Sequence, residues 1–222
     1  QLTRVVLKRL AGSITSAIED DKARGKAERD LKDIGPSYVV STIVAVITGA
    51  RGVMHFTQLL GAPDLVRMTG ADRHLSTGVG EGWVASCLGV ERTNYLFLAF
   101  MIQDLCHVMY FFPRLGGVEQ LFHHTTFFIA SVISGGYQIN HFPFSWLIMC
   151  ELSTVFLEAR WFLIKVGSGS GPAMAMVSQL FALVFGVTRV LIYGWGAWQM
   201  WQTTPLIIEH TEAPSHLVYG NL

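Results

Sequence analysis

Residues 94–112 read NYLFLAFMIQDLCHVMYFF, a long apolar run in which Asp104 is the one residue carrying a full charge at neutral pH. A helix needs about 20 predominantly apolar residues to cross the hydrocarbon core of a bilayer, and this run comes close to that length. The run therefore predicts a membrane-spanning helix. It also raises the question of why a carboxylate is placed inside such a helix.

Four other apolar runs accompany this one. They cover residues 37–60, 121–139, 143–164 and 173–201. The last is long for a single span, and we expect a kink near Gly194 and Gly196. The chain of 222 residues is 51% hydrophobic and 14% charged, whereas soluble domains carry roughly 25% charged residues. We therefore predict an all-α fold, a multi-pass transmembrane helical bundle with about five spans.

The charged residues gather ahead of the spans. Residues 19–33 hold eleven charges in fifteen positions, which predicts a solvated helix that Pro36 would separate from the first span. Apolar residues recur every fourth position from Leu2 to Ile18. That spacing suits an amphipathic helix on a membrane surface or against a partner, and equally an ordinary surface helix. The predicted organisation is an amphipathic, charged N-terminal arm (1–36), a transmembrane domain (37–201) and a polar C-terminal tail (202–222).

Two Gly-rich stretches separate the spans. Residues 61–93 predict a polar loop, and GSGSGP at 167–172 predicts a flexible turn. The side of the bundle that holds the N-terminal arm carries eleven Lys and Arg residues, against three (Arg67, Arg73 and Arg92) on the opposite side. Basic residues accumulate on the cytoplasmic side of membrane proteins, so the N-terminus is predicted to lie there or on its topological equivalent.

Charge and cysteine usage narrow the class of protein. The formal net charge is zero, so no nucleic-acid partner is expected. The three cysteines are odd in number, widely spaced and without a CxxC pair, which indicates buried thiols rather than a disulfide framework or a zinc site. The expected partners are membrane lipids. Other subunits of a membrane complex, held through the arm and the tail, are the alternative.

Ionisable side chains inside the apolar runs are costly there, and by default they indicate function. Asp104 and His107, three residues apart, share a helix face. The adjacent pair His123 and His124 opens the run 121–139. The candidate catalytic residues are His123, His124, Asp104 and Glu151. The residues predicted to line a lipid cavity or to connect the helices are His55, His107, Glu158, Arg160 and Arg189.

These residues could serve in a metal site, in acid–base or acyl-transfer chemistry, or as contacts between helices. QLFHH at 120–124 is close to the HxxHH motif of membrane di-iron enzymes, but such enzymes need several histidine clusters and this chain has no second one. No metal site is therefore predicted, and no spacing supports a single zinc at His123, Asp104 and Glu151. Acid–base or acyl-accepting chemistry suits an imidazole oriented by a carboxylate. The remaining alternative is that these groups satisfy one another between helices.

The segment DLCHVMYFFPRLGGVEQLFHHTTFF (104–128), followed by CELSTVFLEARWFL (150–163), resembles the TLC-domain membrane proteins, which include the ceramide synthases. A weaker likeness lies in STIVAVITGARGVMH (41–55), where His55 occupies the position of a family histidine. The resemblance extends over roughly residues 37 to 200. The matching positions are Asp104, Pro113, His123, His124, Glu151, Ser153, Phe156, Leu157, Arg160 and Trp161.

The resemblance implies a helical bundle around a lipid-accessible cavity, with both adjacent histidines facing inward. In ceramide synthases these histidines serve acyl transfer from acyl-CoA. This chain is more similar to the non-synthase members, because the further Asp residues of the synthase branch are missing. The expected function is binding or regulation of membrane lipids without a cofactor. The alternatives are an acyltransferase that uses His123 and His124 with acyl-CoA, and an accessory subunit of a membrane complex. The expected location is the endoplasmic reticulum membrane, with an organellar inner membrane as the alternative.

Overall fold

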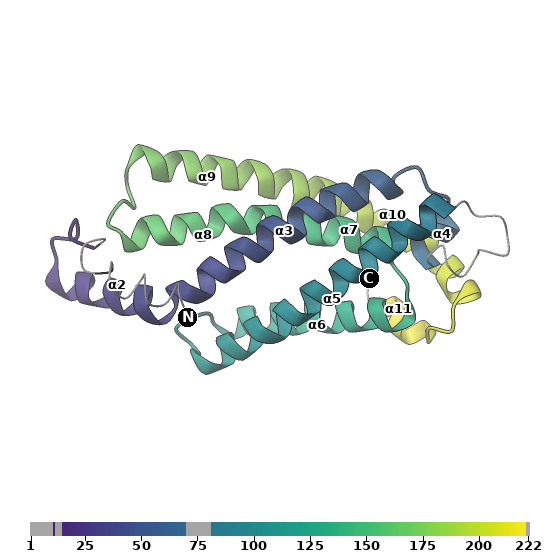
Figure 1. The fold of residues 1–222 in the computed structure, drawn as a ribbon, viewed down its shortest axis with the longest axis horizontal. Helices are drawn as coiled ribbons and strands as arrows, with labels where there is room; N and C mark the ends of the chain where they lie inside the picture. Colours follow the sequence, from purple (N-terminus) through teal and green to yellow (C-terminus); the bar gives the residue numbers. More distant parts are fainter. Residues whose placement is uncertain (1–10, 12–14, 70–80, 221–222) are drawn as a thin grey trace. The chain divides into compact units, whose positions relative to one another are not determined.

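The computed structural model describes residues 11, 15–69 and 81–220 and is all-α, because every regular element in those ranges is a helix. The predicted fold class is confirmed. Most of the expected amphipathic helix between Leu2 and Ile18 lies outside the described residues. The helices are α2 (Asp21–Asp33), α3 (Gly35–Leu59), α4 (Asp64–Thr69), α5 (Glu81–Tyr110), α6 (Val118–Tyr137), α7 (His141–Met149), α8 (Glu151–Lys165), α9 (Pro172–Phe185), the π-helix η2 (Gly186–Ile192), α10 (Tyr193–His210) and α11 (Ser215–Gly220) (Figure 1).

The chain divides into two compact units. The first consists of residues 1–46 and 151–186, and the second of residues 47–150 and 187–222. The boundaries fall inside α3, between α7 and α8, and at the start of η2. Each unit is therefore assembled from segments far apart in the sequence.

In the first unit, α2 forms as its sequence predicts. The Asp20 carboxylate caps it by accepting a hydrogen bond from the Lys22 N–H, and the helix carries Asp21 in its first turn and Lys32 in its last. One face is buried through Leu31 and through Asp30, whose Oδ2 lies 2.7 Å from the Lys165 Nζ of α8. The predicted charged helix is confirmed, although one face of it is packed rather than solvated.

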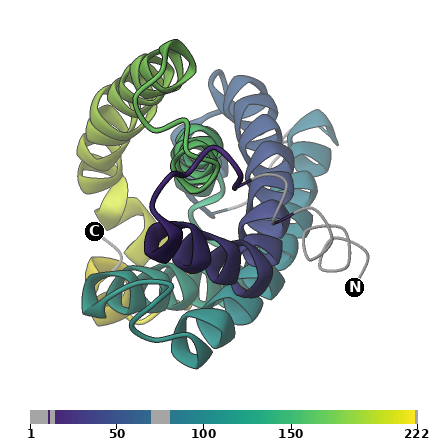
Figure 2. The ribbon, with the colours of Figure 1, turned by 90° about the vertical axis from the view of Figure 1, so that its left-hand side faces the viewer.

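The helices α8 and α9 run side by side in the same unit (Figures 1 and 2). The turn predicted at 167–172 joins them, and Gly167 adopts a φ of 78°, a left-handed conformation that favours glycine. The Tyr38 ring of α3 stacks on the Trp161 ring of α8 with centroids 4.3 Å apart. The Thr42 hydroxyl donates a hydrogen bond to Glu158, so polar and aromatic contacts together hold α8 against α3.

In the second unit, α7 is the buried helix. Eight of its nine residues are buried. Glycines allow its neighbours to approach closely: a Cβ at Gly52 of α3 would lie 2.6 Å from the Met149 backbone nitrogen, and Gly196 of α10 packs against the Trp146 indole. A helix of nine residues is about 14 Å long at 1.5 Å per residue, too short to cross a bilayer.

Two sequence predictions about helix boundaries were wrong. The span expected at 143–164 is interrupted at Cys150, whose N–H bonds the Leu147 carbonyl at 3.1 Å in a tight turn between α7 and α8. The loop expected at 61–93 contains α4 and the first turns of α5. Tertiary contacts explain α4, since its Met68 carbonyl accepts the Asn140 N–H at 2.7 Å in front of α7.

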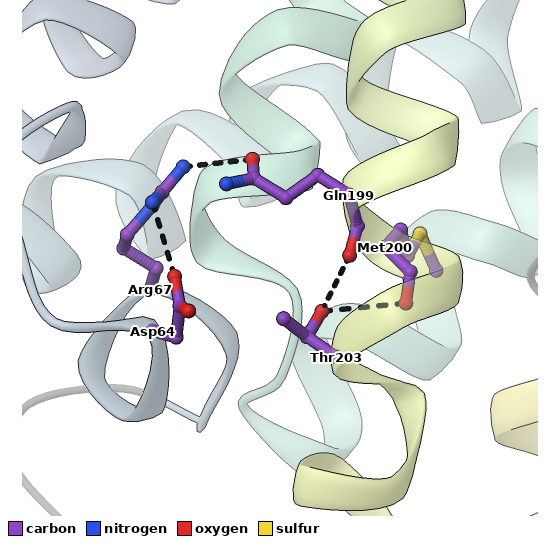
Figure 3. A network of polar contacts seen from close by, with 5 residues as sticks. All are labelled: Asp64, Arg67, Gln199, Met200 and Thr203. Atoms are coloured by element: carbon purple, nitrogen blue, oxygen red, sulfur yellow. Dashed lines mark hydrogen bonds and ion pairs between the residues drawn. The ribbon is translucent and has the colours of Figure 1, made fainter.

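The short helix α4 contacts α7 and α10, and Arg67 links it to α10 through Gln199 (Figure 3). The Arg67 guanidinium lies 3.1 Å from Asp64 Oδ1, donates to Gln199 Oε1 at 2.7 Å, and sits 4.0 Å from the centre of the Phe142 ring. Arg67 is only 7% exposed. Burial lowers the pKa of its guanidinium, and the charge of Asp64 opposes that shift. We call these four residues the Arg67 clasp.

The C-terminal segment is helical and packed. α10 continues to His210, and α11 follows. Ile207, Ala213 and Val218 form a buried cluster with Met68 and Ile139 of the same unit. The π-helix η2 lies directly before Gly194 and Gly196, where a kink was expected.

Two stretches of the described chain are continuous, long and apolar enough to cross a membrane. They are Gly35–Leu59 and Pro172–His210, the latter formed by α9, η2 and α10. Most side chains of the second stretch are not covered by protein. The count of five spans stays a prediction.

Candidate functional site

Asp104 and His124 meet in the second unit because α5 and α6 form a helical hairpin. A short loop at 111–117 joins the two helices, which lie side by side (Figures 1 and 2). Asp104 is near the end of α5 and His124 near the start of α6, so both lie at the same end of the pair. The His124 Nδ1 is 3.1 Å from the Asp104 Oδ2, and the two side chains are 8% and 16% exposed.

Both ring nitrogens of His124 contact polar side chains. The Nδ1–Asp104 contact lies within ion-pair distance, but Nδ1 makes no hydrogen bond, so the ring N–H is not directed at the carboxylate. On the other side, the Gln120 amide contacts Nε2 from one turn earlier in α6. A protonated His124 would therefore have a carboxylate beside it that stabilises its charge.

His123 has a different environment from its neighbour. It is exposed, whereas His124 is buried. The two rings are 5.5 Å apart with planes at 80°, and the His123 ring packs on Phe127 at 4.5 Å. The inward orientation that the family resemblance implied thus holds for His124 and was wrong for His123. The positive charge of Arg189 in η2 is close enough to act on the His123 ring.

Glu151 does not share a unit with the other three candidate catalytic residues. It begins α8 in the first unit, where its Oε2 accepts a hydrogen bond from the Thr154 hydroxyl at 3.0 Å. A carboxylate is stabilised at this position by the positive end of the helix dipole. Within the second unit, the structure brings together His123, His124 and Asp104.

The remaining predicted residues make contacts that connect helices or stay within one helix. His55 of α3 is buried, and its Nε2 lies 2.9 Å from the Thr93 hydroxyl of α5. The His107 Nδ1 lies 2.9 Å from the Gln103 carbonyl of its own helix. In the first unit, Glu158 accepts from Thr42, and the Arg160 guanidinium lies 5.6 Å from the Phe181 ring centre. These contacts fit a role in holding the fold.

Two further polar contacts involve residues that the sequence pattern did not single out. In the first, the Nε2 of His141, at the start of α7, lies 2.9 Å from the Oε1 of Glu91 in α5. The second is the Arg67 clasp, which connects α4 to its neighbours. Glu91 and Arg67 had been assigned to a polar loop. The three-residue spacing of Asp64 and Arg67 is the signal that would have indicated a helix there.

No three His, Cys, Asp or Glu side chains converge as metal ligands in the part of the chain that the structure describes. Comparison with known proteins gives one match: a family model for the TLC domain (TRAM, LAG1 and CLN8) covers residues 74–222, more than half of the chain. No curated protein and no solved structure matches this sequence significantly. The matched region includes α5, α6 and η2, which carry Asp104, the two histidines and Arg189.

Proposed function

This chain belongs to the TLC-domain family of membrane proteins, and from that premise we propose that it binds a membrane acyl lipid at the His123–His124–Asp104 site. The observation that supports the proposal is the pairing of a buried His124–Asp104 contact with an exposed His123 on the next position of α6. The buried pair lies between α5 and α6, and the exposed ring is available to a ligand.

The physical chemistry favours function over scaffolding at this site. Ionisable groups inside membrane bundles are expensive, and those present usually face a ligand path or pair with one another. Asp104 and His124 pair, which accounts for their own burial. That pairing does not account for His123, which is polar, exposed and packed against the Phe127 ring. An aromatic neighbour beside an accessible imidazole suits a ligand with an apolar chain and a polar head.

Lipid binding can be tested with the full-length protein purified from membranes. We expect acyl lipid to remain bound through size-exclusion chromatography and to be detected by mass spectrometry. The double variant His123→Ala/His124→Ala should retain about tenfold less, the loss expected when contacts worth about 1.4 kcal/mol are removed. His210→Ala is the matched control, because His210 is exposed near the end of α10. Equal retention by the wild type and a well-folded double variant would contradict the proposal.

Acyl transfer is the second candidate, and one observation favours it. A carboxylate 3.1 Å from a histidine nitrogen can stabilise the imidazolium that forms when the ring removes a proton from an acyl acceptor. The acyl group would then pass from acyl-CoA to that acceptor, with coenzyme A leaving as the thiol. Release of free thiol from acyl-CoA, seen in the wild type and His210→Ala but absent in Asp104→Asn, would support this activity. No release above background would remove it.

The family relation also suggests a compartment. We propose the endoplasmic reticulum membrane as the location of this protein. A tagged full-length chain should then overlap with an endoplasmic reticulum marker in cells, and overlap with a mitochondrial inner-membrane marker instead would contradict the proposal.

A further inference from the structure

The stretch formed by α9, η2 and α10 is longer than one membrane crossing needs. It has 39 residues, which rise about 58 Å at about 1.5 Å per residue, about twice the thickness of the hydrocarbon core. Even at a tilt of about 40°, the upper end of the usual range, a helix of this length exceeds the core. Part of the stretch therefore lies outside the hydrocarbon. From residue 187 on, it belongs to the second unit, and the exposed side chains there indicate where it leaves the core.

The exposed face of η2 and α10 changes in character along the chain. Val190 and Leu191 of η2 are exposed and apolar. Trp198 and Trp201 of α10 follow on the exposed face, and Glu209 comes near the end of the helix. No exposed residue between positions 187 and 208 carries a full charge. Apolar, then aromatic, then polar is the order met on passing from the core of a bilayer through its headgroups to water.

Three tryptophans form the aromatic part of this face. Trp195, Trp198 and Trp201 recur every third residue, so they follow one side of α10 and extend about 9 Å along its axis. One polar headgroup layer is similar, about 5 to 8 Å thick. The three residues are 43%, 65% and 60% exposed. An indole combines an apolar ring with one N–H donor, and it therefore suits the boundary between hydrocarbon and water.

The Arg67 clasp gives independent evidence about the same level of α10 (Figure 3). Gln199, the residue after Trp198, accepts a hydrogen bond from Arg67 at 2.7 Å, and the Arg67 guanidinium lies 3.1 Å from Asp64 Oδ1. The Asp64 side chain is 56% exposed. An exposed carboxylate is costly in hydrocarbon. The surroundings of this turn of α10 are therefore polar, which places Trp198 at the edge of the hydrocarbon and not in its interior.

We propose that Trp195, Trp198 and Trp201 lie in the headgroup layer of a phospholipid bilayer, at the point where α10 leaves the hydrocarbon. The exposed side chains of η2 then face acyl chains, and Glu209 lies in water. A protein partner also suits exposed tryptophans, but it does not require an apolar-to-polar order along one helix. This inference is independent of lipid binding at the α5–α6 site.

Nitroxide labels at three exposed positions test the proposal in the full-length protein, reconstituted in phosphatidylcholine bilayers. Val190→Cys, Trp198→Cys and Glu209→Cys are each made in a Cys106→Ser background, because Cys106 is exposed whereas the other two cysteines are buried. Collisions with oxygen, which concentrates in hydrocarbon, and with a water-soluble nickel chelate report the depth of each label. We expect the label at Val190 to lie up to about 12 Å deeper than that at Trp198, the rise of eight residues. The label at Trp198 should lie at the boundary, and that at Glu209 in water.

Every other result at Trp198 overturns the proposal. A label as accessible to nickel as the one at Glu209 places the tryptophans in water. A label as deep as the one at Val190 places them in the hydrocarbon. A label that neither oxygen nor nickel reaches shows that protein covers this face. The Cys106→Ser protein without a new cysteine is the control for labelling of the buried thiols.

Brominated lipids supply the measurement if a labelled variant does not fold. Bromine quenches tryptophan fluorescence at short range, and Trp198→Phe/Trp201→Phe keeps an aromatic ring at both positions. The fluorescence that this variant lacks should be quenched more by phosphatidylcholine brominated near the glycerol end of its chains than by lipid brominated near their methyl end. Trp146→Phe is the matched control, because Trp146 is 3% exposed and its fluorescence should respond little to either lipid. Equal quenching by the two lipids, or stronger quenching from the deeper bromine, contradicts the proposal.

Discussion

The second unit contains two buried polar clusters that differ in one respect. In the Arg67 clasp, the guanidinium is enclosed by α4, α7 and α10, and Arg67 is 7% exposed. At the α5–α6 site, Asp104 and Gln120 hold His124, while the neighbouring His123 stays exposed. A buried charge whose contacts join several helices maintains a fold. A polar pair beside an accessible ring leaves a surface for a ligand.

The two clusters should also differ in what their loss affects, the stability of the fold or the binding of lipid. The clasp joins three helices through one side chain, so it should matter most to stability. The α5–α6 site joins two helices that are already neighbours in sequence, so its loss should affect lipid binding more than folding. The following substitutions test this contrast, beginning with the largest expected change in stability.

The largest effect is expected from Arg67→Met. It removes the hydrogen bond to Gln199 and the contact of the guanidinium with Phe142 but keeps much of the side-chain volume. We expect a loss of about 2 to 4 kcal/mol in the free energy of unfolding. Thermal unfolding in detergent measures this loss.

Asp64→Asn is the control for the clasp. The Asp64 side chain is 56% exposed, so its ion pair should contribute less than about 1 kcal/mol. An Arg67→Met variant as stable as Asp64→Asn would show that the clasp does not hold the fold.

An intermediate effect is expected from a matched pair of glycines in α10. A Cβ at Gly196 would enter the Trp146 indole, whereas a Cβ at Gly194 meets no atom within 4 Å. Gly196→Ala should destabilise by about 1 to 3 kcal/mol through overpacking. Gly194→Ala should stabilise by about 0.5 to 1 kcal/mol, because alanine restricts the unfolded chain. The two melting temperatures, measured side by side, should move in opposite directions, and a shift of the same sign would disprove the packing described for α7.

The smallest change in stability is expected from Asp104→Asn. Polar contacts between membrane helices average about 0.6 kcal/mol, and asparagine keeps the shape of the side chain. The retained acyl lipid should nevertheless decrease, since the substitution removes the negative charge beside His124. A large loss of stability with normal lipid retention would show that this pair, like Arg67, serves the fold.

The sequence was sufficient for the helical class. Apolar runs located α3 and α6, and the cost of burying Asp104 and two histidines singled them out. The partner of Asp104 could not be read from spacing. His107 shares its helix face, yet the contact at 3.1 Å comes from His124. That pairing depends on the register between α5 and α6, which periodicity within one helix does not encode.

The sequence pattern also did not indicate where the helices are interrupted. Cys150 ends α7 without a proline or glycine to mark it, and η2 begins at Gly186, while the glycines expected to kink the helix lie beyond it. Arg67 and Glu91 were placed in a loop because polar residues usually indicate solvent. In this molecule Arg67 is buried and Glu91 is partly buried, and each contacts a side chain from another helix, Gln199 and His141 respectively.

The number of residues in η2 determines the direction in which the side chains of α10 point. Each residue added to or removed from a helix turns the later side chains by about 100°. A single deletion in η2 after Thr188 that restored α-helical geometry would rotate α10 by that amount relative to the contact between the Thr188 carbonyl and the Cys150 thiol. Gly196 would leave the Trp146 ring, and Gln199 would no longer reach Arg67. The length of this segment, counted in residues, is therefore as constrained as its chemistry, and a single-residue deletion there should disrupt the protein more than most substitutions at the same positions.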